Sequence, residues 1–218
     1  MRSELRKRFV NSVEYLRRMD FFKDYSDLSS EEILKKIFNG EIDHSSSWWD
    51  EKRKSKIGRP HGVILRESLM EHEKDWIKSS DARIDRALIV FDAKRVVEEA
   101  IETWLNDEIG VAILKRLARI SRGIFQPTNI SGKWIIPLEY KWAVEEVSFD
   151  FKGKRRSIRM VLRYDYIMDI GLEELNEIIK DTGYQYYEVS SNPMIIVVLT
   201  EEEAKKLEKE RGWIYIPL

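Results

Sequence analysis

The last third of the chain alternates predicted strands and helices in an order that limits the folds available to it. Strand patterns lie at residues 158–168, 184–189, 194–199 and 213–216, and helical patterns lie at 172–181 and 201–211. Gly183 and Gly212 follow the two helices, where glycine commonly ends a helix. The predicted order is therefore strand, helix, strand, strand, helix, strand.

A β-hairpin is predicted directly before these segments. Val147, Phe149 and Phe151 alternate with polar residues, and the alternation resumes after the glycine-containing turn at 152–154. The βαββαβ order that follows is the one a ferredoxin-like sandwich requires. We therefore predict an α+β protein, with a helical N-terminal part followed by a ferredoxin-like βαββαβ sandwich with an extra β-hairpin strand. Folds of this kind carry many unrelated activities, so the architecture leaves the function open.

Helical periodicity dominates the N-terminal part. Leu5, Phe9 and Val13 follow helical spacing, and Ser29 with Glu32 forms a capping-box pattern at the start of a second helix. Residues 41–62 lack periodicity and are predicted to be an exposed arm. Residues 87–91 form a short apolar run that predicts a strand, residues 92–105 predict a helix capped by Asp92, and residues 108–120 predict another helix.

Turn-forming residues are concentrated between 122 and 132, which predicts a domain boundary. The expected domains are residues 1–122, mainly helical with the basic, tryptophan-containing arm at 41–62, and residues 133–218, the ferredoxin-like α+β domain.

The charge composition gives no overall reason to expect a nucleic-acid partner. The chain has 38 Lys and Arg and 39 Asp and Glu, so any such prediction must depend on local patches. The absence of cysteine excludes disulfides, thiol nucleophiles and cysteine zinc sites. Abundant charge with only two glutamines is typical of thermophile proteins. No apolar run has the length of a signal or a membrane span, so we expect a cytoplasmic protein with no membrane partner.

Three groups of basic residues indicate a polyanionic partner. They are the arm, with Trp48, Trp49, Lys52, Arg53, Lys54, Lys56 and Arg59; a helical stripe of Lys115, Arg119 and Arg122; and the hairpin, with Lys152, Lys154, Arg155, Arg156, Arg159 and Arg163. Tryptophans beside cations combine base stacking with phosphate neutralisation. The leading hypothesis is a non-enzymatic nucleic-acid-binding or regulatory module that binds DNA or RNA through the arm and the stripe.

Each basic group also has a purely structural explanation. The tryptophans can dock the arm onto the body of the protein, and cations near a helix C-terminus complement the helix dipole. On the hairpin, Arg159 and Arg163 can pair across strands with Glu146 and Asp150.

A metal-dependent hydrolase, most simply a nuclease, is the first alternative. Asp85 and Asp92 flank the predicted strand, and His72 or Glu71 would complete a metal site at the carboxyl end of that strand. The competing interpretation is that Asp92 caps the next helix and that the histidines are solvated, because their spacing matches no metal-binding motif.

A structural protein that forms a homodimer through its sheet is the second alternative, suggested by the wholly aliphatic strand at 194–199. That aliphatic strand also disfavours an RNA-recognition motif, since Tyr184 and Trp213 would lie on outer strands. No nucleotide-binding or catalytic motif occurs in the sequence, and no cofactor is predicted.

Overall fold

The computed structural model describes residues 2–42, 60–99, 109–137, 142–163, 166–191 and 193–216. They form a mixed α and β protein with two small sheets, which agrees with the predicted α+β class. The chain divides into two compact units. Unit 1 comprises Met1–Val96 and Glu202–Ile214, and unit 2 comprises Val97–Glu201 and Tyr215–Leu218. The predicted division into residues 1–122 and 133–218 stays a prediction.

Unit 1 is helical. Its helices are α1 (Ser3–Arg18), the short 3-10 helix η1 (Lys23–Tyr25), α2 (Ser30–Phe38), α4 (His61–Glu71), α5 (Glu73–Ile77), α6 (Asp81–Ile89) and α9 (Glu201–Arg211). Leu5, Phe9 and Val13 are fully buried, as their spacing predicts. The capping box at the start of α2 is confirmed, because Glu32 N donates to Ser29 Oγ and Ser29 N donates to the Glu32 carboxylate.

Two predicted elements of unit 1 are wrong. Residues 87–91, predicted as a strand, are the end of α6 and the turn after it. The reason is that Ser80 caps α6 by accepting from Arg83 N, while Ile84 and Leu88 bury one helical face. Asp92 does not start a helix, since β1 (Val96–Glu99) follows it. The remainder of that predicted helix, residues 100–105, lies outside the described residues.

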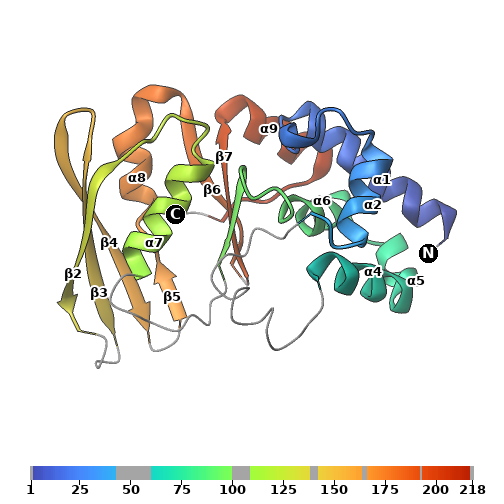
Figure 1. Cartoon of the computed structure of the whole chain (residues 1–218), viewed down its shortest axis with the longest axis horizontal. Helices are drawn as coiled ribbons and strands as arrows, with labels where there is room; N and C mark the ends of the chain where they lie inside the picture. Colours follow the sequence, from blue (N-terminus) through green and yellow to red (C-terminus); the bar gives the residue numbers. More distant parts are fainter. Residues whose placement is uncertain are drawn as a thin grey trace. The chain divides into compact units, whose positions relative to one another are not determined.

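Unit 2 contains both sheets. The four-stranded sheet has the order β2-β3-β4-β5, formed by Thr128–Ile136, Ala143–Phe151, Lys154–Arg163 and Tyr166–Asp169, and every neighbouring pair is antiparallel. The three-stranded sheet has the order β1-β7-β6, with β6 at Tyr184–Ser191 and β7 at Met194–Thr200. Helices α7 (Ile109–Ile120) and α8 (Leu172–Ile179), the latter continued by the 3-10 helix η2 (Lys180–Thr182), lie between the sheets (Figure 1). Their buried side chains share one core with those of β3, β4, β6 and β7.

The predicted hairpin around the turn at 152–154 is confirmed as β3 and β4, which meet at the pair Phe151 and Lys154. Lys152 and Gly153 between them both have positive φ, the backbone that tight hairpin turns require. The alternation also agrees, because Val147, Phe149 and Phe151 are buried on one face of β3.

The ferredoxin-like arrangement is not confirmed. Residues 158–168, predicted as one strand, belong to two antiparallel strands, because Leu162 of β4 pairs with Ile167 of β5. Strand β4 consequently shares its sheet with β2 and β3, whereas β6 and β7 lie in the other sheet. The predicted last strand contributes a single bridge, between Ile216 and Glu188.

Strand β7 occupies the centre of its sheet, and all six apolar residues from Met194 to Leu199 are buried. The exposed aliphatic surface on which the dimer hypothesis depends is therefore not formed by this strand. Among the described residues, no helix combines the length and the apolar character needed to cross a membrane.

Candidate functional site

Helix α7 presents two exposed cations from a helix that is firmly held in the core of unit 2. Its residues Ile113, Leu114 and Leu117 are buried, and the helix packs on β2 and β3. Lys115 and Arg119 lie one turn apart and are both exposed. Because residues four apart share a helix face, these two side chains form the predicted stripe on the side away from the core.

Arg122, the third predicted member of the stripe, follows the end of α7 and contacts an aromatic ring. Its Cζ lies 4.9 Å from the centroid of the Tyr184 ring, within the range of a cation–π contact. Both residues are half-buried, and Arg122 has a left-handed backbone with φ of 58°. The structure therefore places Arg122 against the first residue of β6.

Hydrogen bonds on both sides fix the position of this contact. Ser121 Oγ donates to Phe125 O at 3.1 Å and accepts from Phe125 N at 3.2 Å, which closes the turn that contains Arg122. The Tyr186 hydroxyl donates to Leu117 O at 3.0 Å and joins α7 to β6. Burial raises the pKa of Tyr186, so the hydroxyl stays protonated and able to donate.

The sequence carries a stronger signal for this site than the spacing of the three cations. Residues 109–138 contain no Asp or Glu, although acidic residues number 39 in the whole chain. The same stretch holds Lys115, Arg116, Arg119, Arg122 and Lys133. Of these, Arg116 donates to Glu98 O at 3.0 Å. An acid-free stretch of this length identifies α7 as a basic element, and the proximity of Tyr184 could be found only from the fold.

The predicted arm lies outside the described residues. Trp48, Trp49, Lys52, Arg53, Lys54, Lys56 and Arg59 all fall in residues 43–59, so the arm stays a prediction.

Part of the basic hairpin is engaged in contacts within its own sheet. Arg155 forms an ion pair with Asp150 at 3.3 Å and donates to Asn129 O and Ser131 Oγ. The hydrogen bond that the Asn129 side chain donates to Asp150, together with the one from Arg155, lowers the pKa of Asp150. Arg159 is opposite Glu146, as predicted, but Asp150 is opposite Arg155 and not Arg163, because the hairpin turn sets the register.

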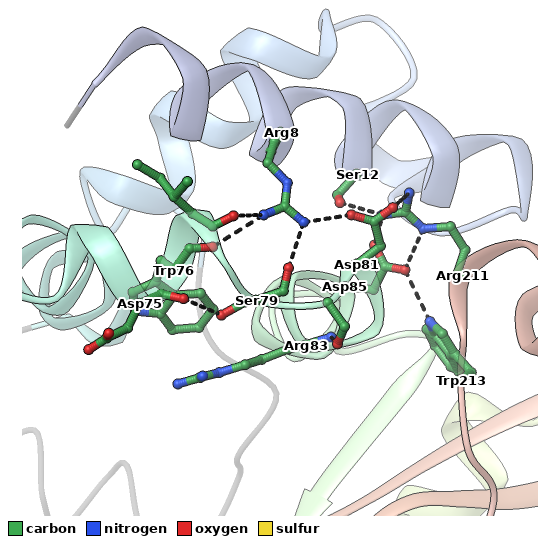
Figure 2. Close-up of polar contacts among 12 residues, drawn as sticks. Arg8, Ser12, Asp75, Trp76, Ser79, Asp81, Arg83, Asp85, Arg211 and Trp213 are labelled. Atoms are coloured by element: carbon green, nitrogen blue, oxygen red, sulfur yellow. Dashed lines mark hydrogen bonds and ion pairs between the residues drawn. The ribbon is translucent and has the colours of Figure 1, made fainter.

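The candidate acids of the hydrolase alternative bind protein groups in unit 1. Asp85 is fully buried on α6, and both its oxygens accept from Arg211, from Nε at 2.8 Å and from Nη2 at 2.7 Å. Trp213 Nε1 donates to Asp85 Oδ2 at 3.1 Å (Figure 2). Asp85 is thus the centre of a buried ion pair.

A second carboxylate and a second arginine extend this ion pair toward α1. Arg211 Nη1 donates to Asp81 at 3.0 Å and Nη2 donates to Ser12 Oγ at 2.6 Å. Arg8 Nη2 donates to the other Asp81 oxygen at 2.8 Å and to Ser79 O at 2.7 Å (Figure 2). Helices α1, α6 and α9 are therefore joined by one polar network.

Asp92, His72 and Glu71, the other candidate metal ligands, are not grouped around a common point among the described residues. Asp92 accepts from the backbone N–H groups of Phe22 and Lys94, and burial raises the pKa of its carboxyl group. His72 is exposed between α4 and α5, with Nε2 3.9 Å from a Glu71 oxygen. In the part of the chain that the structure describes, no group of three or more His, Asp and Glu side chains is placed to hold a metal ion.

Comparison with known proteins gives no further assignment. No protein-family model, curated protein or solved structure matches the chain. The functional inference must therefore depend on the residues themselves.

Proposed function

We propose that the protein is a non-enzymatic nucleic-acid-binding module that contacts phosphates through Lys115, Arg119 and Arg122. The observation that carries the proposal is the pair of exposed cations Lys115 and Arg119 on α7, a helix without acidic residues whose opposite side is buried in a core; Arg122 follows directly after this helix. The helix backbone that carries these cations is already ordered, so binding restricts only their side chains, which favours affinity. Phosphate contacts of this kind release counterions, so the affinity should fall steeply with salt.

The arm is the second part of the proposed interface. Its two adjacent tryptophans and five cations combine stacking surfaces with positive charge in one short segment. An interface that neutralises phosphates and stacks bases without reading base edges would have weak sequence preference.

The experiment is fluorescence anisotropy with labelled DNA and RNA oligonucleotides at two or more salt concentrations. The double variant K115A/R119A should bind about tenfold more weakly and should reduce the slope of log K against log salt by about 1.4 for a single strand, since each lost phosphate contact removes about 0.7. The variant K52A/R53A/K54A/R59A should also weaken binding if the arm takes part.

A matched control separates the stripe from overall charge. Lys205 and Lys209 are exposed and lie four residues apart on α9, so K205A/K209A removes the same charge with the same spacing from another helix. This control should bind like the unmodified protein. Equal loss in both double variants, or no binding at low salt, would exclude the stripe as the binding site.

Neither alternative gains an observation in its favour. The hydrolase alternative used Asp85, whose carboxylate is bound by Arg211 and Trp213, and the dimer alternative used residues of β7, which are buried. The same oligonucleotides incubated with Mg²⁺ should stay intact. Their cleavage would instead favour the hydrolase.

A further inference from the structure

Strand β2 (Thr128–Ile136) forms an open edge of the four-stranded sheet. It pairs with β3 on one side, and among the described residues no strand lies on its other side (Figure 1). An edge strand presents N–H and C=O groups to which an extended segment of another protein can add. We infer that β2 binds an acidic, extended segment of a partner protein as an additional strand. The inference goes beyond the proposed function, because it concerns another surface and another class of partner.

Exposure and hydrogen bonding both indicate that the outer edge of β2 is uncovered. Seven of its nine residues are exposed, including the apolar Ile135 and Ile136, with exposed fractions of 48% and 38%. In the described part of the chain, no backbone group of β2 forms a hydrogen bond outside its own sheet. Both the backbone edge and these two side chains are therefore available to a partner.

The edge of the other sheet is closed by the protein itself. On β6, the Asn176 side chain donates to Tyr186 O at 3.0 Å and accepts from Tyr186 N at 2.7 Å. Two residues further along, Ile216 N donates to Glu188 O at 2.9 Å. These groups satisfy the backbone of β6 as a neighbouring strand would. Strand β2 has no such cover among the described residues, which distinguishes it as a place for an added strand.

The charges on the outer face of the sheet determine which kind of segment fits. Lys133 of β2 lies opposite Glu146 of β3, and Glu146 lies opposite Arg159 of β4. The charges in this row alternate in sign, and the next position beyond Lys133 belongs to the added strand. Opposite charges on neighbouring strands stabilise a sheet, whereas like charges destabilise it. An Asp or Glu therefore fits opposite Lys133.

The core side of β2 requires apolar residues in the same segment. Ile130 and Trp134 pack against the core cluster of unit 2 but are only half-buried, so the core is incompletely covered at this edge. Successive side chains of a strand point to opposite faces of the sheet. The added segment should therefore have apolar residues on its core side, alternating with polar and acidic residues on its outer side.

The charge of β2 argues against a second copy of this chain as the occupant. Residues 109–138 contain no acidic residue, so two β2 strands paired with each other would place no acid opposite either Lys133. A lysine on an edge strand is also a usual protection against self-pairing. A different protein, with a strand of opposite charge, is therefore the partner that fits.

The test uses two fluorescently labelled peptides with blocked ends and nine residues, the length of β2. In both, valine alternates with threonine, and the central threonine is replaced by glutamate in one peptide and by lysine in the other. The unmodified protein should bind the glutamate peptide about twofold or more tightly than the lysine peptide, and Lys133→Glu should reverse this preference. Lys154→Glu makes the same charge change at an exposed residue of β4, away from the edge, and should keep the preference.

Hydrogen exchange shows where the glutamate peptide binds. It should slow the exchange of the β2 amides and leave those of β5, the opposite edge of the sheet, unchanged. A Kd above about 1 mM for the glutamate peptide, or an unchanged preference in Lys133→Glu, would overturn the inference. So would loss of peptide binding in K115A/R119A, which would place the peptide on the α7 stripe. Protection of the β2 amides that grows with protein concentration in the absence of peptide would make the occupant a second copy and also overturn it. The proposed function is tested separately with oligonucleotides and does not depend on these results.

Discussion

The arginine at position 211 shows how strongly a single residue can control the stability of this chain. Its guanidinium binds a carboxylate, Asp85, that has no exposed surface. A buried charge is tolerated only while it has a partner of opposite charge and its hydrogen bonds are satisfied. Removing Arg211 alone is therefore expected to destabilise the folded protein more than replacing both Arg211 and Asp85.

We predict that Arg211→Ala lowers the free energy of unfolding by about 3–5 kcal/mol, the usual result of leaving a buried charge unpaired. Urea denaturation at neutral pH measures this change. Lys209→Ala, in the same last turn of α9 but exposed, should change stability by less than about 0.5 kcal/mol. Similar values for the two variants would mean that the Asp85 ion pair contributes little.

At the scale of elements, the capping box of α2 gives a pH-dependent prediction. Hydrogen bonds from Ser29 lower the pKa of Glu32 from its usual 4.5, so the folded protein favours the ionised carboxylate. A carboxyl whose pKa is lower in the folded state contributes stability above its unfolded pKa, and this contribution is lost as the pH falls through the folded pKa.

Glu32→Gln should consequently destabilise the protein near pH 7, and the difference from the unmodified chain should shrink below about pH 4. Urea denaturation at several pH values between 7 and 3 measures it. Glu31→Gln provides a control, because Glu31 lies in the same turn but takes no part in the cap, and its ion pair with Arg6, at 2.7 Å, is solvent-exposed and expected to be worth less than about 1 kcal/mol. A difference that is constant over this pH range would show that the charge of Glu32 is irrelevant to the cap.

Elements with a local chemical signal could be predicted from the sequence, and elements decided by distant contacts could not. The α2 capping box and the β3–β4 hairpin each depend on neighbouring residues, and both are confirmed. The apolar run at 87–91 has no periodicity of its own, so only the packing of Ile84 and Leu88 makes it part of a helix. Residues 158–168 keep strand alternation throughout, and nothing in that alternation predicts the reversal between β4 and β5.

The candidate site likewise has a part that local sequence predicts and a part that distant contacts decide. Helical spacing predicts Lys115 and Arg119 on one face of α7, whereas Arg122 follows the end of that helix. The Tyr184 ring lies 62 positions along the chain from Arg122, and the partner of Asp85 lies 126 positions away, so neither contact leaves a local pattern. A sequence taken alone predicts the charges that an element carries, and the fold decides which of them are already paired.

At the scale of the whole molecule, unit 1 is built from both ends of the chain. Its first segment ends at Val96, and its second, Glu202–Ile214, supplies α9 and Trp213. The second segment provides both groups that donate to Asp85, and Leu207 of α9 is fully buried. The buried Asp85 therefore lacks these donors until residues 202–214 have been made.

A chain that ends at residue 200 should accordingly lose the native packing of α6, although α6 lies more than 100 positions from the cut. Hydrogen exchange of the α6 amides measures this, since local unfolding exposes them. We expect strong protection in the full chain and rapid exchange in the shortened one. A chain that ends at Ile214 is the matched control, because it keeps α9 and Trp213 and removes only residues of unit 2. In this control chain the α6 amides should stay protected from exchange. If α6 stays protected without residues 201–218, the first segment satisfies Asp85 by itself and unit 1 does not depend on the return of the chain.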